Sequence, residues 1–242
     1  MKASPSDQRQ IIDVAAFDQK TTALNHTAAT LPEIAELATL TTKSHNARDL
    51  RIAAETELSD VKRELLRAEG DVEQIVTRIT RDETRLSGGS ASPKELEQLQ
   101  HEVGTLNARR SELEEIELEI MMRVDEIKAR IDELQSQESS FTDQINDLNI
   151  RKENALARIN GELESISKER AETLASVSPE LIALYEKIRA SNNGTGAAAL
   201  VAGACTGCHL SINTVELKRM TELADDEVVR CEECRCILVR GV

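Results

Sequence analysis

The chain has 242 residues, a formal net charge of −14 and 31% charged residues, but only two Phe, one Tyr and no Trp. A compact core of this size normally uses large aromatic side chains, so the composition excludes an ordinary globule and favours long helices or a coiled coil. The acidic balance disfavours proteins that bind nucleic acid or anionic membranes.

Prolines mark the predicted helix starts. They are Pro5, Pro32, Pro93 and Pro179, each within two residues after a Ser or Thr. Proline suits the first turn of a helix because its missing N–H has no intrahelical partner there. The predicted helices cover about 5–25, 32–86 and 93–175, followed by a short helix from 179. Ser92 and Glu95 fit a capping box, and Ser178 is expected to cap the short helix.

The two long predicted helices carry apolar residues at alternating steps of three and four, which is the a/d pattern of a coiled coil. In the first of them this seam consists of Leu58, Val61, Leu65, Ala68, Val72, Ile75, Ile79 and Leu86, with Asp82 in one slot. In the second it includes Leu96, Leu99, Val103, Leu106, Leu113, Ile120, Val124, Ile127, Ile131 and Leu134.

A short turn is predicted between these helices, over residues 87–92, where glycines and serines end one helix and reverse the chain. Two heptad helices joined by a short turn predict an antiparallel hairpin. We assign residues 1–177 to it and place the helix over 5–25 beside the base of the longer arm. Residues 178–197 are expected to form a short helix and a linker.

Residues 198–242 are predicted to be a metal-binding β ribbon. They hold all five cysteines, four of them in the pairs Cys205-x-x-Cys208 and Cys231-x-x-Cys234. Four thiolates from two such turns surround one ion at ~2.3 Å, and a site with four protein ligands is structural rather than catalytic. We predict one structural Zn²⁺, since so small a module needs a metal to fold. A rubredoxin-like iron site and a redox disulfide pair are the alternatives.

Two more side chains accompany these pairs. Cys236 either replaces Cys234 as a ligand or is a spare thiol on a strand, and the Cys-x-x-Cys spacing favours the spare. His209 directly follows Cys208 and has poor geometry for a fifth ligand. No Ser/His/Asp set, phosphate loop or carboxylate pair stands out, so we expect neither enzyme activity nor a small-molecule substrate.

The cellular location follows from two features. No apolar run approaches the ~20 residues of a membrane span, and MKASPSDQRQ at the start lacks the apolar stretch of a signal peptide. We therefore expect a cytoplasmic protein with no membrane partner. Thiols stay reduced in the cytoplasm, which favours metal binding over disulfides.

Three segments, SPELIALYEKIR, GACTGCHLSI and CEECRCILV, resemble the bacterial C4-type zinc-ribbon proteins of the DUF164 type. The resemblance implies a helical hairpin followed by a zinc ribbon whose ligands are Cys205, Cys208, Cys231 and Cys234. Some members of that family act as chaperone-like adaptors. The family usually has glycine and arginine where this chain has Arg235 and Cys236. Arg235 must therefore either adopt a left-handed backbone or shift the turn.

The leading functional prediction is a non-enzymatic adaptor that binds partner proteins through its coiled coil and its ribbon. The alternative is RNA or DNA binding through the ribbon, with Arg230, Arg235 and Arg240 as contacts. Five basic against seven acidic residues over 198–242 disfavour this alternative. A third reading is a redox or metal sensor that uses the Cys236 thiol.

Overall fold

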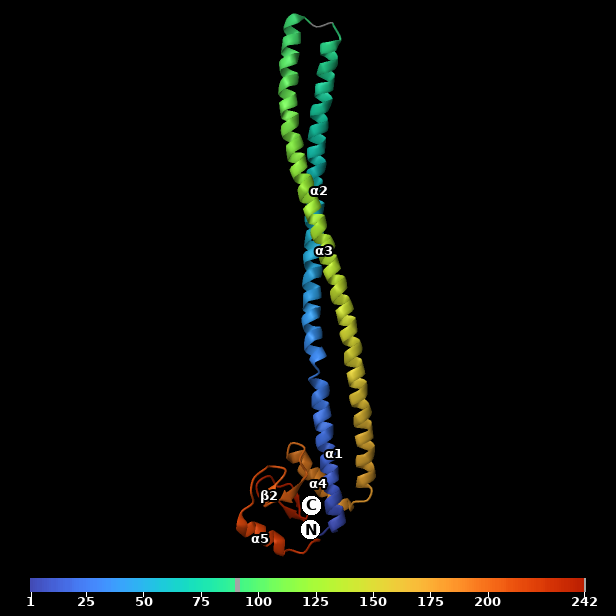
Figure 1. The fold of residues 1–242 in the computed structure, drawn as a ribbon, viewed down its shortest axis with the longest axis vertical. Coiled ribbons are helices and arrows are strands. Elements are labelled where there is room, and N and C mark those ends of the chain that lie inside the picture. Colours follow the sequence, from blue (N-terminus) through green and yellow to red (C-terminus); the bar gives the residue numbers. More distant parts are fainter. Residues whose placement is uncertain (90–91, 242) are drawn as a thin grey trace. The chain divides into compact units, whose positions relative to one another are not determined.

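The computed structural model describes residues 1–89 and 92–241. It confirms the predicted class, in which a long helical hairpin precedes a small ribbon of strands (Figure 1). Residues 90 and 91 of the predicted turn, and residue 242 of the predicted ribbon, lie outside the described residues. The helices are α1 (Pro5–Ala29), α2 (Pro32–Ser87), α3 (Pro93–Leu174), α4 (Pro179–Ser191) and α5 (Thr214–Glu222).

Each of the four prolines is the first residue of a helix, as predicted. Of the two predicted caps, one forms its side-chain hydrogen bonds and the other does not. The capping box of α3 is confirmed, because the Ser92 amide donates to Glu95 Oε2 at 2.8 Å and the Glu95 amide donates to Ser92 Oγ at 3.4 Å. Ser178 stands at the N-cap of α4, as predicted, but its side chain makes no capping hydrogen bond. Its amide instead donates to Asp7 Oδ2 at 3.0 Å, which ties α4 to α1.

The chain divides into two compact units. Residues 36–148 form the hairpin unit, which contains most of α2 and the first part of α3. Residues 1–35 and the described residues from 149 onward form the base unit, which contains α1, the end of α3, α4 and the ribbon.

The hairpin unit is held by the predicted heptad seam. Its buried cluster consists of Ala54, Val61, Val124 and Ile127, with Leu58, Leu65, Ile120 and Ile131 packed against it. Asp82 fills its seam slot with 1% of its surface exposed. Ion pairs also join the two arms: the partly buried pair Arg51–Glu138 and the exposed pairs Arg78–Glu102, Arg123–Glu64 and Arg130–Glu57. Since the three exposed pairs each contribute about 0–1 kcal/mol, the apolar seam supplies most of the stability.

The ribbon in the base unit is one small sheet among the described residues, with the strand order β2-β1-β4-β3. The strands are β1 (Ala197–Val201), β2 (Ala204–Cys205), β3 (Val229–Arg230) and β4 (Ile237–Val239). β1 pairs in parallel with β4, while the β1–β2 and β3–β4 pairs are antiparallel. The helix predicted between the cysteine pairs is α5.

The ribbon shares its core with the helices of the base unit. Ile11 of α1, Leu181 of α4 and Ile237 of β4 are fully buried in one cluster. The first residues also pair with the ribbon, since the Ala3 amide donates to the Asp226 carbonyl at 2.8 Å and the Val228 amide donates to the Met1 carbonyl at 3.0 Å. The strands are therefore supported by α1 and α4 in addition to any metal.

A buried ionic cluster joins α1, α3 and α4. The Asp18 carboxylate is 4% exposed and accepts from Arg170 Nε at 2.9 Å and from the Tyr185 hydroxyl at 2.6 Å. Arg189 Nε lies 3.1 Å from the same carboxylate, and Glu186 flanks both guanidinium groups. Burial and the hydrogen bond to Asp18 raise the pKa of Tyr185, so its hydroxyl remains a donor at any physiological pH.

Tyr185 also explains why residue 196, which precedes β1, is a glycine. A Cβ at this position would lie 2.5 Å from Tyr185 Cε2 and 2.9 Å from the Tyr185 carbonyl oxygen. Because the ring is fully buried and cannot move aside, Gly196→Ala is expected to destabilise the base unit by about 1–3 kcal/mol. The measurement is chemical denaturation followed by circular dichroism.

Gly161, in the C-terminal part of α3, supplies the matched control for this overpacking effect. No atom lies within 4 Å of a Cβ built there. Gly161→Ala should therefore stabilise the chain by roughly 0.5–1 kcal/mol, through helix propensity alone. Equal effects of the two substitutions would contradict the steric explanation.

Within the described residues, no helix is both long enough and apolar enough to cross a membrane.

Candidate metal centre

Each Cys-x-x-Cys pair lies in a tight turn, here called a knuckle, and the two knuckles have matching backbone hydrogen bonds. In the first, the His209 amide donates to the Cys205 carbonyl at 2.8 Å and the Cys205 amide donates to the Leu210 carbonyl at 3.1 Å. In the second, the Arg235 amide donates to the Cys231 carbonyl at 3.0 Å, and the Cys231 amide bonds the carbonyl of residue 236 at 3.0 Å. Each knuckle thus turns its two cysteines toward the same side.

The four sulfur atoms of Cys205, Cys208, Cys231 and Cys234 all lie within 4.8 Å of one another. The Sγ atoms of Cys205 and Cys234 are 3.8 Å apart, as are those of Cys208 and Cys231. Tetrahedral coordination with metal–sulfur bonds of ~2.3 Å separates the ligands by about 3.8 Å. The four cysteines are therefore positioned to bind a metal ion, and their spacing fits the geometry of zinc.

Burial changes the acidity of this cluster. Cys205 and Cys231 are buried, whereas Cys208 and Cys234 are partly exposed. Burial raises the pKa of the Cys234 thiol to about 12 in the metal-free chain. The thiol is then protonated at neutral pH, so a metal ion must displace protons when it binds.

Arg235 adopts the left-handed backbone, with φ of 59°. This is the first of the two outcomes expected for an arginine at the usual glycine position. His209, at the matching place in the first knuckle, also has φ of 59°. This strained backbone was not predicted, although aligning the two Cys-x-x-Cys pairs places His209 opposite Arg235. His209 is exposed and does not belong to the sulfur cluster.

This backbone strain gives a prediction for Arg235→Gly. A left-handed conformation costs an L-residue roughly 1–2 kcal/mol, so glycine should raise the stability of the metal-loaded protein by about 1 kcal/mol. Thermal unfolding of the loaded protein measures the effect. Arg235→Ala is the control and should change little, because alanine keeps the strained Cβ. Equal stabilisation by alanine would point to the arginine side chain instead.

The three arginines proposed as nucleic-acid contacts have different environments. Arg235 is exposed, and Arg230 Nε donates to the Arg235 carbonyl at 3.0 Å. The Arg240 guanidinium donates to four carbonyl oxygens in and after α5, those of Met220, Leu223, Ala224 and Glu227, at 2.5–3.0 Å. Arg240 therefore closes the carbonyl end of α5, a role that the sequence analysis did not find.

Arg240→Met should accordingly destabilise the ribbon. Hydrogen bonds from a charged donor contribute about 1.5–3 kcal/mol, and the loss leaves several carbonyls without a partner, so we expect a loss of about 2–3 kcal/mol. Urea denaturation measures it. Lys218→Met is the control, because that side chain is 78% exposed and should tolerate the change. A neutral Arg240→Met would contradict the structural role.

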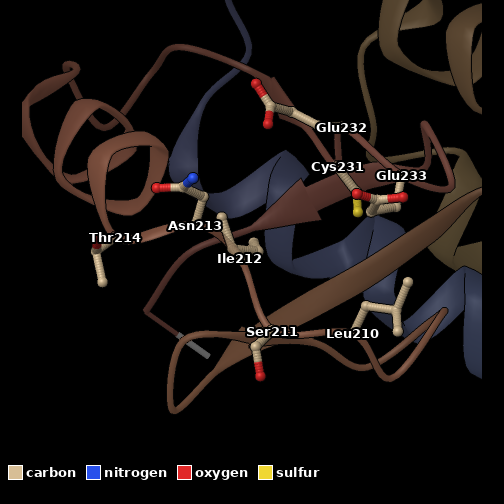
Figure 2. A pocket seen from close by; sticks show the side chains of 8 residues that line it. All are labelled: Leu210, Ser211, Ile212, Asn213, Thr214, Cys231, Glu232 and Glu233. Atoms are coloured by element: carbon tan, nitrogen blue, oxygen red, sulfur yellow. The ribbon is translucent and has the colours of Figure 1, made fainter.

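A hollow of about 450 Å³ lies next to the sulfur cluster (Figure 2). Residues 210–214, which lead from the first knuckle into α5, form one wall, and residues 231–233 of the second knuckle form the other. Glu232 and Glu233 are exposed at this hollow, and Leu210 is 50% exposed. The surface beside the metal site is thus acidic with an apolar patch.

Comparison with known families decides where the chain belongs. A model of the family described as CT398-like coiled coil hairpin domain matches residues 14–193, and one described as C4-type zinc ribbon domain matches residues 204–238. The chain belongs to the CT398-like coiled-coil hairpin family. Its zinc-ribbon match spans both knuckles and all five cysteines.

Relatives in mycobacteria match nearly the whole chain. Uncharacterized protein Rv2229c of Mycobacterium tuberculosis is 34% identical, covering 99% of this chain and 98% of that protein. Uncharacterized protein ML1638 of Mycobacterium leprae is 26% identical, covering 93% and 96%.

Solved structures share the fold. One from Mycobacterium smegmatis has a TM-score of 0.84 at 29% identity, and the two chains cover each other completely, at 100%. CT398 from Chlamydia trachomatis has a TM-score of 0.66 at 20% identity, covering 97% of this chain and 98% of that one. At that level of identity, CT398 supports the fold alone.

Proposed function

We propose that this protein is a non-enzymatic adaptor that binds an amphipathic helix of a partner protein along its coiled-coil hairpin. The observation that carries the proposal is an apolar groove left open on the hairpin unit. The groove has a volume of about 370 Å³, and its apolar lining includes Leu50, Ala53 and Leu134. Leu50 is 60% exposed, so a large apolar side chain of this lining faces solvent.

The groove suits a helix because its two walls are themselves helices, α2 and α3. A third helix that placed its apolar face between them would cover Leu50 and Ala53, as helix-in-groove recognition does. Glu57 and Arg130, which pair with each other, and Glu133 line the groove and give its surroundings charges of both signs. The net charge of −14 favours association with a basic partner.

Further exposed apolar side chains support a binding role for the hairpin unit. They are Ile52, Leu66, Ile116, Leu118, Met121 and Met122, each at least 43% exposed. Methionine is flexible and is over-used at surfaces that accept different partners. A hairpin with no partner would gain solubility by carrying charged residues at these positions.

For the metal we infer one structural Zn²⁺ held by the four cysteines. Four protein ligands leave no open position for a substrate, which supports a structural rather than a catalytic ion. We also infer a cytoplasmic location, because reduced thiols are needed to hold the ion.

The ribbon offers a second contact for a protein rather than for nucleic acid. Zn²⁺ with four thiolates carries a net charge of about −2, and Glu232 and Glu233 add to it at the neighbouring hollow. Arg240 is occupied by backbone carbonyls. This arrangement supports recognition of a basic protein segment and would repel phosphates.

Co-purification from the native host, followed by binding measurements with the purified candidates, tests the adaptor proposal. The groove variant is Leu50→Glu with Ala53→Glu, both at exposed positions. The control is Ser59→Glu, which adds negative charge to an exposed position that does not line the groove. A partner that binds the wild type and the control at least about tenfold more tightly than the groove variant supports the proposal. Equal binding to all three proteins would overturn it.

A further inference from the structure

Cys236 brings a fifth sulfur against the metal site. Its Sγ atom lies 3.2 Å from that of Cys234 and 3.7 Å from that of Cys205, and the residue is fully buried. Cys236 belongs to the buried apolar cluster of the base unit. Its thiol in addition contacts two members of the four-cysteine cluster, which a thiol that only filled space would not need to do.

Knuckle geometry alone does not impose this position. The hydrogen bonds of the two knuckles match, so Cys236 occupies the place that Leu210 has in the first knuckle. Leu210 is 50% exposed, whereas Cys236 is completely covered. The second knuckle therefore directs toward the cluster a side chain that the first knuckle leaves in solvent.

The distances show how the fifth sulfur relates to a metal. Two ligands of one tetrahedral zinc are about 3.8 Å apart. Cys205 is 3.7 Å from Cys236 and 3.8 Å from Cys234, so either fits as its neighbour. Cys234 and Cys236, at 3.2 Å, are too close to each other to be two ligands of one ion. Their sulfurs are alternatives.

We propose that Cys236 is a reserve metal ligand that exchanges with Cys234. In the arrangement seen here Cys234 is the fourth ligand, because the four sulfurs that all lie within 4.8 Å of one another include Cys234 and not Cys236. In the metal-free chain the two sulfurs share a hydrogen bond, in which the Cys234 thiol donates to Cys236 Sγ at 3.2 Å. When Cys234 is lost or blocked, Cys236 takes its place beside Cys205 as the fourth thiolate. The inference depends on the metal site proposed above.

The test compares metal binding in four variants of the full chain with the wild type. They are Cys234→Ala, Cys236→Ala, the double variant of both, and Cys208→Ala. Cys208 is the matched control, because among the described residues its close sulfur neighbour is Cys231, itself a ligand. Zinc content after dialysis gives the stoichiometry, a competing chelator gives the affinity, and Co²⁺ absorption reports the number of thiolates from the charge-transfer intensity.

We expect Cys234→Ala and Cys236→Ala each to hold one metal ion with four thiolates and an affinity within about tenfold of the wild type. Cys208→Ala and the double variant should lose more than about a hundredfold in affinity. A three-thiolate Co²⁺ spectrum for Cys234→Ala, or a loss of affinity equal to that of Cys208→Ala, would overturn the proposed exchange. Neither result would contradict the proposal of a structural zinc. A wild type that holds no metal would overturn both. Circular dichroism of each variant identifies unfolding, and an unfolded Cys234→Ala counts against the proposal.

Discussion

Removing the metal with a strong chelator is expected to unfold the ribbon while the hairpin unit stays helical. The strands contain two to five residues each, too few to persist without support. Structural zinc sites contribute on the order of 10–16 kcal/mol in isolated zinc-finger peptides. The packing of α1 and α4 on the sheet offsets part of this loss. The hairpin unit contains no cysteine and keeps its own seam.

Hydrogen exchange followed by mass spectrometry measures this effect segment by segment. Peptides from 197–239 should lose their protection after chelation, whereas peptides from 54–65 and 120–131 should keep theirs. Added Zn²⁺ should restore the ribbon, and added Mg²⁺, which prefers oxygen ligands, should not. Cys208→Ala should reproduce the chelated state without chelator. A ribbon that stayed protected after chelation would show that α1 and α4 suffice to hold it.

The helices and the metal cluster were predictable because their signals are local in sequence. Proline after Ser or Thr fixes a helix start within one turn, and the steps of three and four fix which face of α2 meets α3. The two-residue spacing within each cysteine pair likewise fixes a knuckle. Two knuckles of the same kind in one small module then imply that the four sulfurs meet.

Contacts between distant segments were not predictable in this way. No pattern near Ala3 indicates that its amide bonds Asp226, and the isolated Tyr185 gives no sign that it contacts Asp18. Arg240 is the clearest case. Its place after a cysteine knuckle suggests a surface contact, and only the fold brings it to the end of α5.

The role of Cys236 was only partly predictable from the sequence. Its spacing left two readings open, a replacement ligand or a spare thiol, because sequence alone does not say where a side chain after a knuckle points. The complete burial of Cys236 and its contact with Cys234 favour the replacement ligand over the spare thiol. The strained backbone of Arg235 lies between these two cysteines.

Substitution of Asp18 by asparagine is expected to destabilise the base unit strongly. The carboxylate balances two guanidinium groups, those of Arg170 and Arg189, and accepts the Tyr185 hydroxyl. Burial lowers the pKa of Arg170, but hydrogen bonds to Asp18 and Glu186 outweigh it and raise that pKa overall. Without Asp18, both guanidinium groups keep their pairs with Glu186 but lose the buried carboxylate. Removing one partner of a buried pair typically costs about 3–5 kcal/mol, and the partial exposure of both arginines places the expected loss near 3 kcal/mol.

Urea denaturation of three variants separates charge from packing. Tyr185→Phe removes one hydrogen bond and keeps the ion pairs, so it should cost about 1 kcal/mol. Asp13→Asn, on an exposed site of the same helix, should stay within about 0.5 kcal/mol of the wild type. The predicted order of destabilisation is therefore Asp18→Asn, then Tyr185→Phe, then Asp13→Asn. If Tyr185→Phe matched Asp18→Asn, the tyrosine hydrogen bond rather than charge balance would hold α1, α3 and α4 together, because that bond is the one interaction both substitutions alter.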